Sequence, residues 1–81
     1  MTVTSINQVT HELDASGLNC PLPILQTRKA IGGIETGELL RVRSTDPGSL
    51  KDMESFCNQT GNDLIDSSEL DGAYEFLIRK N

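Results

Sequence analysis

Hydrophobic and polar residues alternate in three short parts of the chain, and this alternation is typical of strands with one buried face. A fourth strand is expected to begin at Leu64-Ile65. In the first part, Val9, His11 and Leu13 share one side of the chain. The dipeptide Asp71-Gly72 is typical of a tight turn, so the last two strands are expected to form a hairpin. The predicted strands cover residues 8–13 and 39–43, begin again at residues 64–65, and end with residues 74–79.

Two helices are predicted between these strands. The first covers residues 20–31, with prolines at its start and Gly32-Gly33 after its end. The second begins at residue 49 or 50 and stops at Gly61. Glycine is favoured just after a helix because it adopts the left-handed backbone conformation at little cost.

The resulting βαβαββ order predicts an α/β two-layer sandwich. A helix that connects two strands favours parallel pairing of those strands, whereas the final hairpin must be antiparallel. We therefore expect a four-stranded mixed sheet with two helices on one face. The 81 residues are expected to form one domain over residues 1–81, because so short a chain holds only two layers.

Charge and composition narrow the class of partner. Twelve acidic residues against seven basic ones give a net charge of −5, which disfavours nucleic acid and favours basic protein surfaces. Membrane-spanning runs and the apolar region of a secretory signal are not found in the sequence. Neither cysteine has a second Cys or His at metal spacing. We expect a monomeric cytoplasmic protein without a metal or cofactor.

Cys20 lies at the predicted start of the first helix, where an N-cap residue belongs. Pro21 and Pro23 lack N–H groups, so the N–H of Leu22 is expected to point toward the Cys20 sulfur. That donor and the helix dipole favour the thiolate, which is the nucleophilic form of cysteine. Pro21 and Pro23 are thus predicted to orient the sulfur. The pattern also fits a small residue that merely enters a helix, so the local sequence leaves both interpretations open.

The periodicity of the first helix gives it two apolar sides. Ile24, Thr27 and Ile31 fall on one side, which is expected to face the sheet. Leu22 and Leu25 project from the other side, beside the cysteine. This exposed apolar pair favours a surface for partner docking, and packing beneath a neighbouring loop is the alternative.

Asp46 has two candidate roles ahead of the second helix. Its side chain can organise the Asp-Pro-Gly turn that it begins, or it can pair with a basic residue of a partner. Ser49 and Asp52 have a spacing that resembles a capping box, with Asp46 as the alternative cap.

Cys57 and His11 are expected to have structural roles, and the role of Arg28 stays open. Cys57 shares a helical stripe with Leu50 and Met53, so we expect it to pack in the core. His11 has no Cys or acid at catalytic spacing and is interpreted as a strand residue. Arg28 fits either a solvated helix face or a contact with a partner, and the sequence leaves this open.

The motif Cys20-Pro-Leu-Pro stands among landmarks that together resemble the TusA (SirA-like) family of sulfur carriers. The resemblance covers about residues 12–80 and departs at Gly61-Asn62, where many relatives have Gly-His. The other landmarks are Leu13-Asp14, Gly17-Leu18, Arg28-Lys29, Gly37-Glu38, Thr45-Asp46-Pro47, Phe56-Cys57 and the closing Tyr74-Glu-Phe-Leu-Ile-Arg-Lys80.

The resemblance implies that Cys20 carries sulfur as a persulfide. It also implies a cysteine desulfurase or a rhodanese as sulfur donor and a DsrE-type or TusD-type protein as acceptor. The sulfur would serve tRNA thiolation, cofactor assembly or sulfur oxidation. Because transfer requires docking at the cysteine, the predicted contact residues are Leu22, Leu25, Arg28 and Asp46.

Two other classes of function compete with the sulfur carrier. An RNA-binding or regulatory module is disfavoured by the net charge of −5 and by three aromatic residues without an interleaved basic patch. A thiol redox protein normally has its resolving cysteine in a Cys-x-x-Cys motif, which this sequence lacks.

Overall fold

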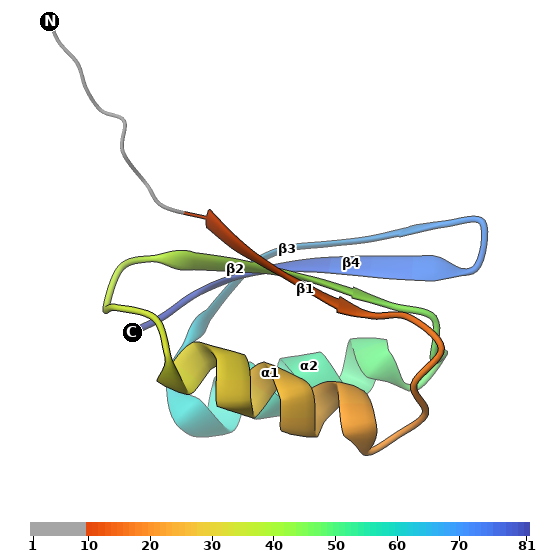
Figure 1. Cartoon of the computed structure of the whole chain (residues 1–81), viewed down its shortest axis with the longest axis horizontal. Helices are drawn as coiled ribbons and strands as arrows, with labels where there is room; N and C mark the ends of the chain where they lie inside the picture. Colours follow the sequence, from red (N-terminus) through yellow and green to blue (C-terminus); the bar gives the residue numbers. More distant parts are fainter. Residues whose placement is uncertain (1–9) are drawn as a thin grey trace, which may run out of the picture.

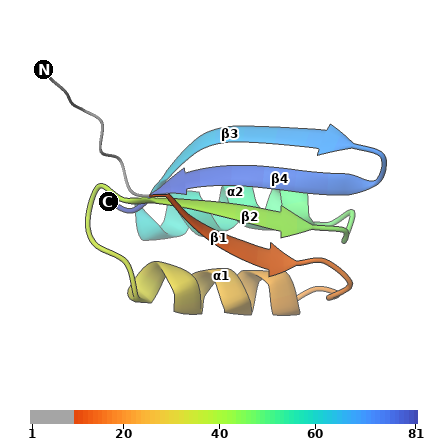
Figure 2. The ribbon, with the colours of Figure 1, turned by 45° about the horizontal axis from the view of Figure 1, so that its top comes forward.

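The computed structural model describes residues 10–81 and arranges them in two layers (Figure 1). A four-stranded sheet forms one layer, and two helices cover one face of it. Both helices begin at the same end of the molecule (Figures 1 and 2). The elements are β1 (Thr10–Ala15), α1 (Leu22–Gly32), β2 (Leu39–Ser44), α2 (Ser49–Thr60), β3 (Asp63–Leu70) and β4 (Ala73–Arg79). This arrangement confirms the predicted βαβαββ sandwich.

The sheet is mixed, as predicted, with the strand order β1-β2-β4-β3 (Figure 2). β1 and β2 pair in parallel from Thr10 opposite Leu39 to Ala15 opposite Ser44. β4 pairs antiparallel with β2 and with β3. The parallel pairing places the ends of β1 and β2 side by side, so the two loops that lead into the helices meet at one edge of the sheet.

β1 extends beyond its predicted end. The prediction stopped at residue 13, whereas Asp14 and Ala15 continue the strand and pair with Arg43 and Ser44. Ala15 is fully buried, and its small side chain gives little signal in an alternation pattern. Residues 8 and 9 of the predicted strand lie outside the described residues.

The ends of both helices match their glycines, and α2 begins at Ser49, as predicted. The start of α1 and the N-caps of both helices differ from the prediction. Gly61 has a φ of 78° and its N–H donates to the carbonyl of Cys57. α1 begins at Leu22 with Pro21 as its N-cap, so Cys20 is not the N-cap. Gly48 is the N-cap of α2 without a side-chain hydrogen bond, and the predicted capping box is therefore wrong. The hydroxyl of Ser49 instead lies 2.6 Å from that of Ser44.

The core lies between the helices and the sheet. β2 and β4 occupy the centre of the sheet, so their inward side chains are covered on all sides. Leu50 belongs to the predicted stripe of α2 but is 40% exposed, so the stripe is narrower than expected. The buried cluster consists of Ile31, Ile34, Leu40, Val42, Met53, Phe56, Cys57, Phe76 and Ile78.

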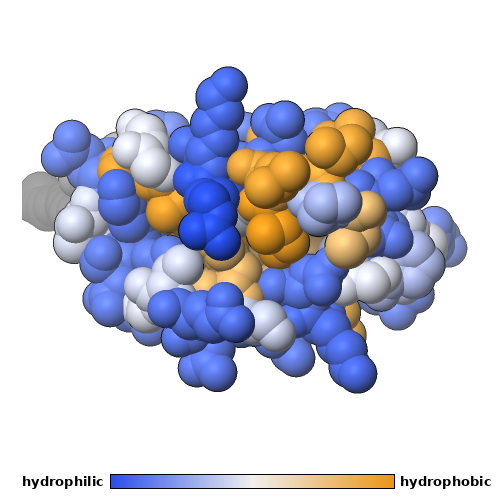
Figure 3. Space-filling view, turned by 90° about the horizontal axis from the view of Figure 1, so that it is seen from below, coloured by the Kyte–Doolittle hydropathy of each residue, from blue (hydrophilic) through white to orange (hydrophobic). Residues whose placement is uncertain are grey.

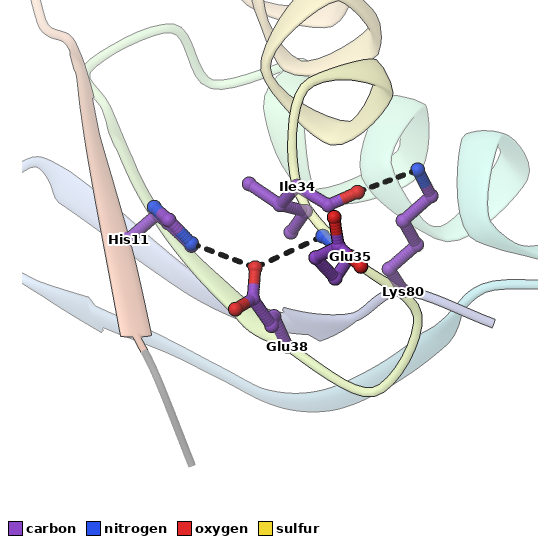
Figure 4. A network of polar contacts seen from close by, with 5 residues as sticks. All are labelled: His11, Ile34, Glu35, Glu38 and Lys80. Carbon is purple, nitrogen blue, oxygen red and sulfur yellow. Dashed lines mark hydrogen bonds and ion pairs between the residues drawn. The ribbon is translucent and has the colours of Figure 1, made fainter. Parts of the chain in front are cut away.

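A polar network fastens the end of the molecule opposite the helix starts (Figure 4). Glu38 Oε1 lies 3.0 Å from His11 Nε2 and accepts the N–H of Glu35 at 2.9 Å. These hydrogen bonds lower the pKa of Glu38. Lys80 donates to the carbonyl of Ile34 at 2.7 Å. The contacts join β1, the end of α1 and the end of β4, and they give His11 a structural role.

Replacing Phe76 by Ala should test the packing of this core. Phe76 is 1% exposed, and deletion of a buried aromatic ring costs about 3–5 kcal/mol of unfolding free energy. The matched change Leu70→Ala at a 75% exposed position should cost no more than about 0.5 kcal/mol. Urea unfolding followed by circular dichroism measures both, and equal losses would contradict the assigned core.

Candidate functional site

Cys20 is exposed in the loop between β1 and α1, immediately before the N-cap of α1. Its backbone N–H donates to the Asp46 carboxylate at 3.2 Å. The same two loops are joined again by the N–H of Gly17, which donates to Thr45 Oγ1 at 2.9 Å. Two side chains from the β2–α2 loop therefore hold the loop that carries the cysteine. Asp46 contacts the cysteine backbone directly, which the sequence did not predict.

The first turn of α1 does not aim a backbone donor at the sulfur. The N–H of Leu22 donates instead to the carbonyl of Asn19 at 2.8 Å, which contradicts the predicted interaction. The loop turns back on itself before the helix and satisfies this N–H locally. Pro23 is fully buried and its carbonyl accepts the Thr27 hydroxyl at 2.8 Å, so Pro23 anchors the helix start in the core.

Two carboxylates lie close to the Cys20 sulfur. Cys20 Sγ and one carboxylate oxygen from each of Asp46 and Asp52 lie within 4.8 Å of one another. A hydrogen bond to Asp52, desolvation and the two negative charges raise the pKa of the Cys20 thiol above its usual range. The expectation that the helix start favours the thiolate is therefore wrong, because the surroundings of Cys20 favour the protonated thiol.

Asp52 is the residue that sequence reasoning missed, since it entered only as half of a capping box. It lies in the first turn of α2, 32 positions after Cys20.

One thiol and two carboxylates supply three donor groups, fewer than the four of a structural zinc site, and we assign no metal to them.

A shallow groove of about 210 Å³ runs from Cys20 between the two helices. The guanidinium of Arg28 lies 5.4 Å from the centre of the Phe56 ring, a cation–π distance that holds this exposed side chain beside the groove. The groove is lined by Cys20, Pro21, Ile24, Arg28, Asp52, Ser55, Phe56 and Gln59.

The outer side of α1 exposes the apolar pair that the periodicity predicted. Leu22 is 44% exposed and Leu25 is 51% exposed, whereas Thr27 and Ile31 are buried against the sheet. Figure 3 shows apolar side chains gathered over the half of the helix layer in which the helices begin. Leu22, Leu25 and Arg28 follow one another at intervals of three along this exposed side, and Asp46 lies on the neighbouring loop.

Cys57 packs in the core, as predicted. It is 3% exposed, and burial raises the pKa of its thiol to about 11. A thiol in this environment is protonated at neutral pH and has little contact with solvent. Of the two cysteines, only Cys20 is accessible.

The fold and site define a small α/β protein that presents a single exposed cysteine immediately before a helix. A family model described as "Sulfurtransferase TusA" matches residues 11–80. The chain belongs to the TusA family of sulfur carriers.

Individual relatives agree with this assignment. A "Sulfur carrier protein TusA" of Allochromatium vinosum is 54% identical over 70 residues, which cover 86% of this chain and 92% of the relative. A putative sulfur carrier protein of Neisseria meningitidis is 46% identical over 67 residues, covering 83% and 90%. The crystal structure of a SirA-like protein from Desulfitobacterium hafniense superposes with a TM-score of 0.75 at 26% identity, covering 84% and 93%.

The two cysteines should differ sharply in alkylation of the folded protein. Iodoacetamide should label Cys20 and leave Cys57 unlabelled at neutral pH, because Cys57 is buried and its pKa is raised to about 11. The rate at Cys20 should continue to rise as the pH passes the range of an ordinary thiol, since its pKa is raised too. Peptide mass spectrometry measures both rates. Equal labelling of the cysteines, or a rate at Cys20 that levels off near neutral pH, would refute this account.

Proposed function

We propose that Cys20 accepts a sulfane sulfur as a persulfide and transfers it to a cysteine of another protein. The Cys20 sulfur attacks the outer sulfur of a donor persulfide, and the sulfur–sulfur bond of the donor breaks. Cys20–SH and donor–S–SH become Cys20–S–SH and donor–SH, so the thiol proton of Cys20 balances the departing donor thiolate. The same exchange in the next step passes the sulfur to the acceptor.

The main support for the proposal is the exposure of Cys20 at the start of a helix, in a chain of the TusA family. Asp46 holds the cysteine loop in this position. A carrier thiol must reach two different partner cysteines in turn, so it has to lie on the surface. Cys57 fails this requirement because it is buried. The names of the relatives identify those proteins as sulfur carriers, which supports the same chemistry here.

The partners in this proposal are a cysteine desulfurase or a rhodanese as donor and a DsrE-type or TusD-type protein as acceptor. The sulfur would then serve tRNA thiolation, cofactor assembly or sulfur oxidation. A free thiol persists in a reducing compartment, which supports placing the carrier in the cytoplasm. Among residues 10–81, no helix is long and apolar enough to cross a membrane.

Docking on both partners is proposed to use the outer side of α1. Leu22 and Leu25 supply apolar area beside Cys20, and Arg28 supplies a positive charge one turn further along. Asp46 is occupied by the Cys20 backbone, so its contribution to docking is to hold the cysteine loop in place. One surface must serve donor and acceptor in succession, because only one accessible cysteine carries the sulfur.

The variant Cys20→Ser should abolish persulfide formation. Incubation with a cysteine desulfurase and L-cysteine should add the mass of one sulfur to the parent protein and none to Cys20→Ser. The control Cys57→Ser should still gain one sulfur, although a hydroxyl in the core costs about 1–3 kcal/mol of stability. Intact-mass spectrometry with and without a reductant reads the result. A mass gain of one sulfur in Cys20→Ser would contradict the proposal. So would a parent protein that loses the mass of two hydrogens by oxidation and gains no sulfur.

The variants Leu25→Glu and Arg28→Glu should slow protein-to-protein transfer severely, by tenfold or more if either is an anchor of the interface, since anchors contribute about 2 kcal/mol or more. Alkylation of Cys20 by iodoacetamide should change little. Arg28→Glu also removes the contact with Phe56, worth about 0.5–1 kcal/mol of stability.

The matched control is Ile65→Glu, which places the same charge on an exposed apolar residue of β3. It should transfer sulfur at the parent rate. Transfer at the parent rate by Leu25→Glu and Arg28→Glu would show that docking uses another surface, and unfolding of Leu25→Glu would assign Leu25 to the core.

A further inference from the structure

Two acidic side chains face the sulfur of the proposed carrier cysteine. The Asp52 carboxylate approaches from the first turn of α2, and Asp46 approaches from the loop before it. Within residues 10–81, the other charged group that lines the groove at Cys20 is Arg28, whose guanidinium is held over the Phe56 ring. The sulfur therefore lies on the acidic side of its own groove.

The two carboxylates have different tasks. Asp46 accepts the backbone N–H of Cys20 and so fixes the loop. Asp52 presents a carboxylate oxygen within 4.8 Å of the sulfur. Loss of the thiol proton would leave a thiolate beside two carboxylates, and these negative charges would repel one another. A positive charge brought to the site would remove that repulsion and would be attracted by the same two groups.

We propose that Asp52 is a positioning residue that keeps Cys20 protonated in the free carrier and favours reaction partners that bring a positive charge to the sulfur. The expected partner is a protein with a lysine or arginine beside its reactive cysteine. The net charge of −5 favours encounter with such a surface. This inference rests on the proposed function, because it concerns how the same cysteine is activated. Cys20 would then react slowly with neutral thiol reagents and quickly in a suitable complex.

Small disulfides of different charge test the proposal without a partner protein. Cystamine carries positive charges and hydroxyethyl disulfide carries none. Each reacts as Cys20–SH plus R–S–S–R to give Cys20–S–S–R plus R–SH, so the departing thiolate takes the proton. The rates are measured by mass spectrometry across a range of pH for the parent protein, Asp52→Asn, Asp52→Glu and the control Glu54→Gln. Glu54→Gln removes the same charge from an exposed position of α2 that does not line the groove.

The parent should react faster with cystamine than with the neutral disulfide. In Asp52→Asn the ratio of the cystamine rate to the hydroxyethyl disulfide rate should fall about two- to fivefold, which is the effect of one charge at short distance in water. The same variant should react faster with the neutral disulfide, and its pH profile should move to lower pH. The rate with the neutral disulfide should rise about threefold for each tenfold rise in the thiolate fraction, because a less basic thiolate is also a weaker nucleophile. Glu54→Gln should match the parent, and Asp52→Glu should restore most of the preference.

An unchanged ratio and pH profile in Asp52→Asn would overturn the proposal and leave Asp52 as a helix-start residue only. If Asp52→Asn does not fold, the salt dependence of the parent protein tests the proposal instead. Its preference for cystamine should shrink as sodium chloride is added, since salt screens exposed charges. A preference that salt does not change would overturn the proposal as well. Failure of sulfur loading from a desulfurase would instead refute the proposed function, and the disulfide rates would be unaffected.

Discussion

The site depends on the parallel pairing of β1 and β2. Because these strands run in the same direction and in register, both end at one edge of the sheet, with Ala15 opposite Ser44. The loops that follow must meet there, and both helices then start from that edge (Figure 1). This topology brings Cys20 to Asp46 and to the first turn of α2, although the three are far apart in sequence. The hydrogen bond from Cys20 to Asp46 fixes the contact.

The elements of the fold could be predicted because each is specified by local pattern. Alternation identified the central strands, in which the buried residues lie two positions apart: Leu40 and Val42 in β2, and Phe76 and Ile78 in β4. Gly61 marked the end of α2, and the Asp71-Gly72 turn marked the boundary between β3 and β4. The residues at both places have positive φ. The predictions that failed were the end of β1, the start of α1 and the N-caps of both helices. Ser49 turned toward Ser44 rather than to its own helix, as a distant neighbour offered a better hydrogen bond.

The place of Cys20 just before a helix could be predicted, but its electrostatic surroundings could not. The helix dipole and the N–H of Leu22 were expected to set the pKa of the thiol, because both lie within a few residues of Cys20. The controlling charges belong to Asp46 and Asp52, which reach the sulfur only through the tertiary fold. Neither aspartate lies near Cys20 in the sequence, so no local pattern signals that contact. The exposure of Leu22 and Leu25 was predictable for the opposite reason, since helical periodicity alone separates them from the buried side.

The central claim is that the transferred sulfur resides on Cys20 and on no other residue. The most direct measurement supplies a cysteine desulfurase with isotopically labelled cysteine, digests the carrier without reductant and locates the label by tandem mass spectrometry. We predict one labelled sulfur attached to an unlabelled sulfur on the peptide that contains Cys20, and its quantitative release by a thiol reductant. Label on the peptide that contains Cys57, or a carrier that remains unlabelled while the desulfurase is active, would contradict the account.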